Sequence, residues 1–282
     1  MGLPAHMAGP RLVDAHVHIR NPEGIASIAA ARIAAVRDAG MKGRSRRDAE
    51  RNLQSRGLPI ILSAAWALYK KGGYGSLLGV AVDTKEEIRS EIPKLKNAGA
   101  GIIKVIASGL VSLTEPGRVT PGGFNREELL LIAGEAGSLG LGVMAHANGE
   151  DAILAAAESG VRSVEHGFFM TARALEAMAK HGTYWTPTVG ALARAAGSTT
   201  VSNEMKTYVT ELIASQLEMI GRARDIGVPL AVGTDCVLPD PKYKKIYDAE
   251  LSYFERAGIS REDVLHIACE GGARLLGLSN TT

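Results

Sequence analysis

The 282-residue sequence has little cysteine, no long apolar run and no marked excess of charge of either sign. Two cysteines, Cys236 and Cys269, are too few for a disulfide framework, which favours a reducing, cytoplasmic setting. No uninterrupted apolar stretch reaches the roughly 20 residues that span a bilayer, and no secretory signal pattern is visible. The formal net charge of +2 gives no strong field toward nucleic acid or an anionic membrane. The densest basic stretch, Lys42–Arg51, also carries acidic residues and is typical of a solvated helix.

The length suits one large domain, because a single (β/α)₈ barrel uses roughly 250 residues. We expect residues 1–10 to be an N-terminal tail, with His6-Met7 typical of a cloning remnant. Residues 11–282 are expected to form the barrel domain. The sequence leaves the oligomeric state open, and a homo-oligomer is compatible with it.

Short apolar segments alternate with longer amphipathic ones along the chain. Helices are expected at Thr84–Asn97, Asn125–Leu139, Glu150–Ser159, Thr171–Lys180, Asn203–Asp225 and Arg261–Leu276. Eight strands are expected at Leu12–Ile19, Ile33–Arg37, Pro59–Ala64, Gly101–Ala107, Leu141–His146, Val161–Glu165, Tyr184–Val189 and Val228–Thr234. This alternation predicts parallel pairing in an α/β fold, a single (β/α)₈ TIM barrel, with an open doubly wound sheet as the alternative. The second strand is the weakest element, since Ile25–Arg37 also fits one Ala-rich helix.

Polar side chains stand at the carboxyl ends of several of these strands, which converge on one mouth in a barrel. Histidines at positions 16 and 18 are two residues apart, so on a strand both point to the same face. Side-by-side imidazoles suit a divalent cation such as zinc, although such a pair alone is weak evidence for a metal. The complete set of strand-end groups is His16, His18, Lys104, His146, His166 and Asp235.

Each of the other strand-end groups also has a plain structural interpretation. Lys104 lies in an apolar strand and could be salt-bridged there, or carboxylated by carbon dioxide to a carbamate that bridges two cations. His146 and His166 could each be satisfied by a backbone carbonyl, and Asp235 could cap the next helix. Four histidines, a lysine and an aspartate on separate strand ends are hard to explain as independent accidents.

In this order the motifs resemble those of the amidohydrolase superfamily in its binuclear form. They are His-Val-His at residues 16–18, Lys104 in Ile-Lys-Val, His146 in Ala-His-Ala, His166 in Glu-His-Gly and Asp235 in Gly-Thr-Asp. Val36-Arg37-Asp38-Ala39-Gly40, Ser108-Gly109 and the ending Ala273–Leu278 are similar to the imidazolonepropionase-like and Xaa-Pro dipeptidase-like branch. That branch usually adds a β-sandwich from both flanks of the barrel, which this sequence lacks.

The resemblance implies a metal-dependent amidohydrolase that acts on a small molecule. His16, His18 and Asp235 would hold one zinc ion and His146 and His166 a second, with carboxylated Lys104 bridging both. A hydroxide between the metals would cleave an amide, cyclic amide or peptide-like C–N bond. Asp235 would transfer protons, so Asp235, Lys104 and His166 are the expected catalytic residues. A lactonase or phosphotriesterase on the same centre is the alternative, and a non-catalytic barrel that binds a metal or metabolite is a further one.

Substrate contacts are expected from the loops after the strands. Residues 16–22 resemble the dihydroorotase opening, where an Arg after the second His holds a substrate carboxylate, which implies that role for Arg20. Trp66 and Tyr69 after strand three, and Phe168 after strand six, are further expected contacts. The segment Val111–Phe124 is rich in Pro and Gly and is expected to act as a lid.

Overall fold

The computed structural model describes residues 11–42, 58–197 and 200–278. The expected tail at 1–10, most of the basic stretch 42–51 and part of the loop at 198–200 lie outside these ranges. Among the described residues, no helix combines the length and apolar character needed to cross a membrane.

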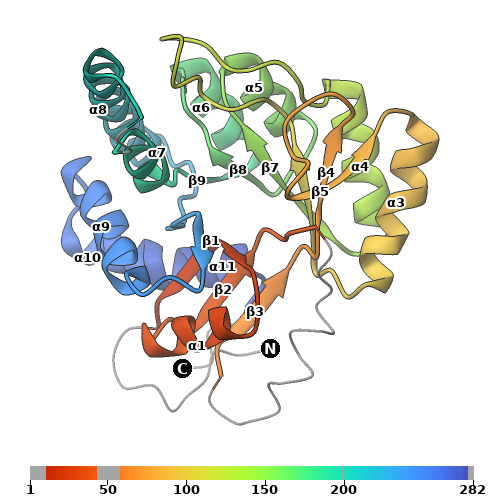
Figure 1. Cartoon of the computed structure of the whole chain (residues 1–282), viewed down its shortest axis with the longest axis horizontal. Helices are drawn as coiled ribbons and strands as arrows, with labels where there is room; N and C mark the ends of the chain where they lie inside the picture. The colour runs from red at the N-terminus through yellow and green to blue at the C-terminus, as the bar shows by residue number, and fades with distance from the viewer. Residues whose placement is uncertain (1–10, 43–57, 198–199, 279–282) are drawn as a thin grey trace.

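The strands form parallel sheets with helices packed around them (Figure 1). One sheet has the order β10-β1-β2-β3, and the other has the order β5-β4-β6-β7-β8-β9. The strands are β1 (Val13–Ile19), β2 (Ala35–Asp38), β3 (Ile60–Ser63), β4 (Ala67–Lys70), β5 (Gly79–Val82), β6 (Ile102–Ile106), β7 (Gly142–Ala147), β8 (Ser163–His166), β9 (Tyr184–Thr186) and β10 (Cys236–Leu238).

Backbone hydrogen bonds join the two sheets on both sides and complete the TIM barrel. On one side, the Gly101 amide donates to the Ser63 carbonyl, and β4 continues the path of β3 and pairs with β6. On the other side, residues 229–235 run between β9 and β1: Ala231 donates to the Trp185 carbonyl and Ala15 donates to the Val232 carbonyl. These residues therefore occupy the place of the eighth strand, although regular pairing is confined to an isolated bridge between Trp185 and Leu230.

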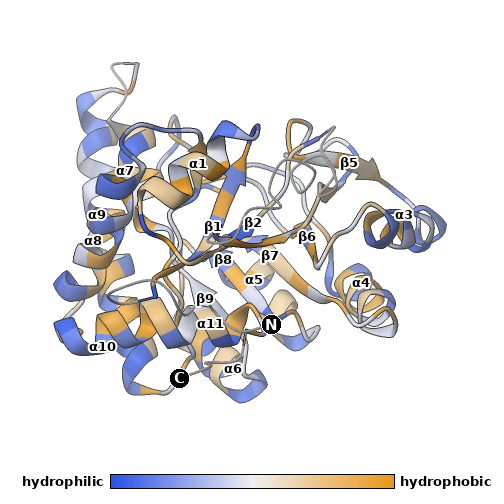
Figure 2. Cartoon of the chain, turned by 90° about the horizontal axis from the view of Figure 1, so that it is seen from below, coloured by the Kyte–Doolittle hydropathy of each residue, from blue (hydrophilic) through white to orange (hydrophobic). Residues whose placement is uncertain are grey.

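The helices cover the outside of the barrel, with their apolar residues turned toward the strands (Figure 2). Local sequence explains several of their ends. Thr84 and Asn125 each begin a helix with a reciprocal capping box, and Gly182 ends another in the left-handed conformation. The helices are α1 (Glu23–Ala30), α3 (Lys85–Asn97), α4 (Arg126–Ser138), α5 (Glu150–Glu158), α6 (Ala172–His181), α7 (Val189–Ala196), α8 (Asn203–Asp225), α9 (Tyr243–Arg256), α10 (Arg261–His266) and α11 (Gly272–Leu275), with a π-helical turn at Ile267–Gly271.

The sequence-based elements are confirmed in the main, with a few differences. The ambiguous segment 25–37 contains most of α1 and most of β2, so the expected second strand is confirmed with its start moved from Ile33 to Ala35, and the single-helix alternative is wrong. The expected last helix is interrupted by the π-helical turn. Helices α7 and α9 and strands β4, β5 and β10 were not expected, because their short or mixed patterns carry little periodicity.

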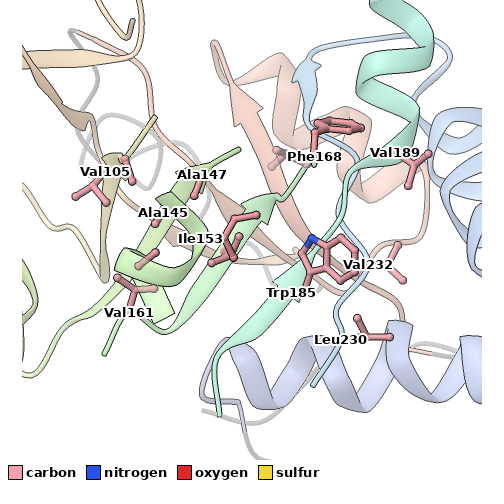
Figure 3. Packing of buried hydrophobic residues seen from close by; sticks show 14 of the residues in the cluster. Val105, Ala145, Ala147, Ile153, Val161, Phe168, Trp185, Val189, Leu230 and Val232 are labelled. Carbon is pink, nitrogen blue, oxygen red and sulfur yellow. The ribbon is translucent and has the colours of Figure 1, made fainter. Parts of the chain in front are cut away.

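The core fills the space between the strands and the surrounding helices. Trp185 is fully buried there and packs in one cluster with Phe168, Val189 and Val232 (Figure 3). Its indole Nε1 donates to the His166 carbonyl at 3.0 Å. The largest core residue thus fixes the backbone at a strand end that carries a candidate ligand.

Candidate metal centre

The six strand-end groups line a single cavity at the carboxyl ends of the barrel strands. The imidazole rings form a continuous group, with centroid separations of 5.1 Å for His16 and His166 and 4.5 Å for His146 and His166. Asp235 Oδ1 lies 3.4 Å from His16 Nε2 and 3.3 Å from His18 Nε2. Ligand atoms of His16, His166 and Asp235 all lie within 4.8 Å of one another, a spacing that suits a shared metal ion.

Both histidines of β1 are anchored through Nδ1. His16 Nδ1 lies 2.7 Å from Glu165 Oε2, and His18 Nδ1 lies 2.8 Å from the Gly40 carbonyl. A carboxylate and a carbonyl oxygen can only accept, so each Nδ1 is the donor. The unprotonated Nε2 of a neutral ring is therefore left toward the cavity, in the form that a metal ligand requires.

The other two histidines are anchored from different elements. His146 Nε2 donates to the Gly109 carbonyl at 2.9 Å, which leaves Nδ1 for the cavity. His166 Nδ1 lies 2.7 Å from the Thr188 hydroxyl, which leaves Nε2. All four rings thus use one nitrogen for the protein and keep the other, as metal-binding histidines do.

Burial governs the charge of most of these rings. It lowers the pKa of His16 and of His146 to about 4, aided by the positive charge of Lys104, and it holds the pKa of His166 well below its usual value. His18 differs: burial opposes its charge, but the contact with Asp235 outweighs burial and raises its pKa. Three of the rings are therefore neutral, and able to bind a cation, at neutral pH.

Lys104 is 1% exposed, and its Nζ has no hydrogen-bond partner among the described residues. Burial lowers the pKa of this amine to about 8, despite the nearby negative charges of Glu165 and Asp235. An unpaired ammonium in such a place is costly. The nitrogen is thus a buried polar atom without a hydrogen-bond partner in the part of the chain that the structure describes.

Backbone geometry turns two of the groups inward. His166 follows Glu165 directly, and simple strand alternation would send the two side chains to opposite faces. His166 has φ of 67° and Asp235 has φ of 51°, both left-handed values that non-glycine residues rarely adopt. Such backbone strain clusters at functional sites, and here it lets neighbouring residues serve one centre.

Asp235 is held from both sides. Its amide donates to the His16 carbonyl at 2.7 Å, and Arg194 Nη2 donates to the preceding Thr234 carbonyl at 2.7 Å. Burial alone would raise the pKa of Asp235, but His16, His18 and His166 hold it well below the usual value. The carboxyl is therefore an anion at neutral pH.

A buried carboxylate that the sequence reasoning missed supports this end of the barrel. Asp14 accepts hydrogen bonds from the His16 amide, from the amide and hydroxyl of Thr234, and from the Tyr243 hydroxyl at 2.9 Å. Burial raises the pKa of Asp14 to about 6, against the lowering by these bonds. The signal was present in the sequence, because Asp14 lies two residues before His16 on the same strand and so faces the same side.

The rest of the cavity is largely apolar and comes from loops and helices. The segment after β6 contributes Leu110, Val111 and Leu113 and folds back on itself through an antiparallel bridge between Val111 and Val119. Helix α7 contributes Ala191, Leu192 and Ala195, and the rest of the apolar lining is Tyr74, Leu78 and Phe168.

Of the four expected substrate contacts, Phe168 lines the cavity, and Arg20, Trp66 and Tyr69 are not among its lining residues. Trp66 Nε1 donates to Glu91 of α3, on the outer side of the sheet. Arg20 is exposed, and Tyr69 packs beside Gly75. The role of these three residues in substrate binding therefore stays a prediction.

The family model described as "Amidohydrolase family" matches residues 7–282. An uncharacterized protein of Mycobacterium tuberculosis is 26% identical over 278 residues, covering 95% of this chain and 74% of that protein. Ochratoxinase of Aspergillus niger is 29% identical over 188 residues, covering 66% of this chain and 38% of the enzyme.

Solved structures agree on the fold. A Xaa-Pro dipeptidase with methionine in its active site superposes with a TM-score of 0.79 at 22% identity, over 95% of this chain and 75% of the dipeptidase. The A. niger ochratoxinase structure has a TM-score of 0.78 at 22% identity, over 95% of this chain and 71% of that chain. The family model matches nearly the whole sequence, and the six strand-end groups lie in one cavity. This chain belongs to the amidohydrolase family.

Proposed function

We propose that this enzyme cleaves the C–N bond of a small amide, cyclic amide or peptide-like molecule at a centre of two divalent cations, with zinc the first candidate. One observation carries the proposal. Four imidazoles, each anchored by one nitrogen, direct the other toward a cavity that also holds an anionic Asp235 and a buried Lys104, whose Nζ has no partner among the residues that the structure describes.

The donor set fits two cations. His16, His18 and Asp235 would hold one, since Asp235 Oδ1 lies within 3.4 Å of both rings. His146 and His166 would hold the other, since their rings are neighbours. Imidazole and carboxylate donors suit zinc, and manganese, iron or cobalt would accept the same set.

Carboxylation of Lys104 would supply the bridge. The neutral amine nitrogen bonds the carbon of carbon dioxide and releases one proton, which gives a carbamate anion with two oxygen donors. This change would remove the cost of burying an unpaired ammonium, because both oxygens gain cationic partners. Carboxylation would also explain why a lysine, Lys104, stands at a position where the neighbouring strands carry histidines.

When bound, the cations would lower the pKa of a water molecule and withdraw electron density from the scissile carbonyl. The chain's own residues would perform the proton transfer. Asp235 is anionic, so a carboxylate oxygen can take the proton of the attacking water and then deliver it to the leaving nitrogen. The apolar lining from Leu110 to Leu113 would exclude bulk water and receive the apolar part of the substrate.

Metal analysis combined with a substrate panel tests this proposal. We expect about two equivalents of divalent metal per chain, with hydrolysis of members of a dipeptide, N-acyl amino acid and cyclic amide panel. Lys104→Ala should lose metal and activity, with partial recovery in a short carboxylic acid that replaces the carbamate. Lys85→Ala, at a lysine that is 54% exposed, is the matched control and should behave as wild type.

Three outcomes would contradict the proposal. A purified protein that binds no divalent metal, or activity that survives a strong chelator, would contradict the proposed metal centre. Hydrolysis of lactones or phosphotriesters without any amide would replace the proposed reaction with the alternative one. Full metal content in Lys104→Ala would contradict the proposal that a carbamate on Lys104 bridges the two cations.

A further inference from the structure

Two charged side chains that are not candidate metal ligands, Arg37 and Glu165, meet inside the barrel. Arg37 of β2 lies 128 residues before Glu165 of β8, yet Arg37 Nη2 donates to Glu165 Oε1 at 2.7 Å. The second carboxylate oxygen, Oε2, accepts from His16 Nδ1 at 2.7 Å. The side chains of Arg37 and Glu165 are both 0% exposed, so water cannot substitute for either partner.

Arg37 also holds the backbone beside the ligand. Its Nε donates to the Ala15 carbonyl at 2.6 Å, directly before His16, and its Nη1 donates to the Ser163 hydroxyl at 2.7 Å. One guanidinium thus ties β1, β2 and β8 together. The peptide that carries His16 and the carboxylate that contacts its ring share this anchor.

The hydrogen bonds from Arg37 to Glu165 and from His16 to Glu165 favour one tautomer of the His16 ring. A carboxylate accepts and cannot donate, so Nδ1 must carry the hydrogen, and in the neutral ring Nε2 then carries the lone pair. Arg37 supplies a buried counter-charge to this carboxylate, with Nη2 only 2.7 Å from Oε1. Charge-assisted contacts are stronger than neutral ones, which limits rotation of the ring.

We propose that Glu165, held in place by Arg37, is the positioning residue that sets the orientation and tautomer of His16 for metal binding. His18 does without such a pair, because the Gly40 carbonyl performs the same task. The inference rests on the metal centre proposed above, but the ring state itself can be measured without metal.

The first experiment measures zinc affinity of the full chain by competition with a chelator of known strength. Glu165→Gln keeps the shape of the side chain but weakens the acceptor and leaves Arg37 without its counter-charge. We expect zinc affinity to fall roughly 10- to 100-fold, the usual effect of losing an outer partner of a metal-binding histidine. Zinc affinity equal to wild type in folded Glu165→Gln would overturn the proposal.

A double variant keeps the test decisive if a lone buried Arg37 prevents folding. Arg37→Met with Glu165→Leu replaces the ion pair by apolar side chains of similar volume, a change that is often neutral for stability. We expect a folded protein, judged by its circular dichroism and melting temperature, that still binds zinc 10- to 100-fold more weakly. Wild-type zinc affinity in this folded variant would likewise overturn the proposal.

Nitrogen NMR of ¹⁵N-histidine-labelled protein gives the second readout. Before zinc is added, His16 of the wild type should show a single Nδ1–H tautomer, and both variants should show averaging between tautomers. An unchanged tautomer in the double variant would overturn the proposal. If wild type itself bound no zinc, the proposed function would fail while the tautomer measurement would still decide the role of Glu165.

Tyr247→Phe is the matched control. Its hydroxyl donates to the Val13 carbonyl at 2.9 Å, so the substitution also removes one buried hydrogen bond to β1. That hydrogen bond does not involve a candidate metal ligand. We expect lower thermal stability with unchanged zinc affinity and an unchanged His16 tautomer. A fall in zinc affinity as large as that of Glu165→Gln would mean that the effect reports general destabilisation, which would overturn the proposal.

Discussion

The floor and the wall of the cavity are built in different ways. The floor consists of titratable groups at strand ends, and its four histidines are each anchored by a hydrogen-bond partner such as Glu165 or Thr188. The wall consists of apolar side chains from the segment after β6 and from α7, which are less regular parts of the fold. Under the proposed function, the floor would carry the chemistry, where sub-ångström placement matters, and the wall would select the substrate.

Loss of the proton carrier on the floor should have the largest effect. Asp235→Asn keeps the shape of the side chain but removes its basic oxygen, so we expect kcat to fall on the order of 10²- to 10⁴-fold. Asp248→Asn, at an aspartate that is 52% exposed, should change kcat little. Steady-state kinetics with a circular dichroism check on folding provides the measurement, and near-normal kcat in Asp235→Asn would assign proton transfer to another group.

Shortening a wall residue should change substrate binding more than turnover. Leu113→Ala removes apolar contact area from the cavity, so we expect KM for an apolar substrate to rise on the order of 10-fold with little change in kcat. Leu130→Ala is the control, because Leu130 is 43% exposed on α4. A drop in kcat as large as that of Asp235→Asn would erase the distinction between wall and floor.

The contact between α9 and α7, which lies behind the apolar wall, should make the free energy of unfolding depend on pH. Glu250 of α9 is fully buried, and its Oε2 accepts from the Gly190 amide of α7 at 2.9 Å. Burial raises its pKa from 4.5 to about 8, against the lowering by that amide and by Arg194. The folded chain thus keeps a proton that the unfolded chain has released, so the free energy of unfolding falls as pH rises from about 4.5 to about 8.

Glu250→Gln should remove that contribution, because the amide keeps an acceptor for Gly190 and cannot ionise. We expect its melting temperature to fall less steeply than that of wild type between pH 5 and about pH 8. Thermal melts of both proteins over that range provide the measurement. Parallel profiles would show that Glu250 does not carry the pH dependence.

The smallest effect is expected where the wall is tethered to α8. The Tyr208 hydroxyl accepts from the Gly117 amide at 2.6 Å, at the tip of the segment after β6. Tyr208→Phe removes this contact at an exposed place, so we expect only a few-fold change in KM and a stability loss of about 1 kcal/mol or less. A change in KM beyond that of Leu113→Ala would make the tether, and not the apolar lining, the main determinant of binding.

The residues of the floor could be predicted from the sequence because their placement follows from local strand geometry. His16 and His18 share a face since strand side chains alternate with a period of two, and the polar ends of separate strands meet in any parallel barrel. The wall could not be read in this way. Trp66 and Tyr69 were expected in a loop, but Tyr69 lies on β4 and Trp66 directly before it. The apolar residues of α7 have the pattern of ordinary core residues.

The sequence by itself determined the alternation of strands and helices, the barrel class and the identity of the six strand-end groups. Only the tertiary structure decided which nitrogen of each histidine remains available, because that choice is made by partners remote in sequence, such as Glu165 for His16 and Gly40 for His18. It also decided that Lys104 is buried and that its Nζ has no hydrogen-bond partner within residues 11–42, 58–197 and 200–278. Spacing along a strand fixes the face of a side chain, whereas its hydrogen bonds and its charge are set by whatever packs against it.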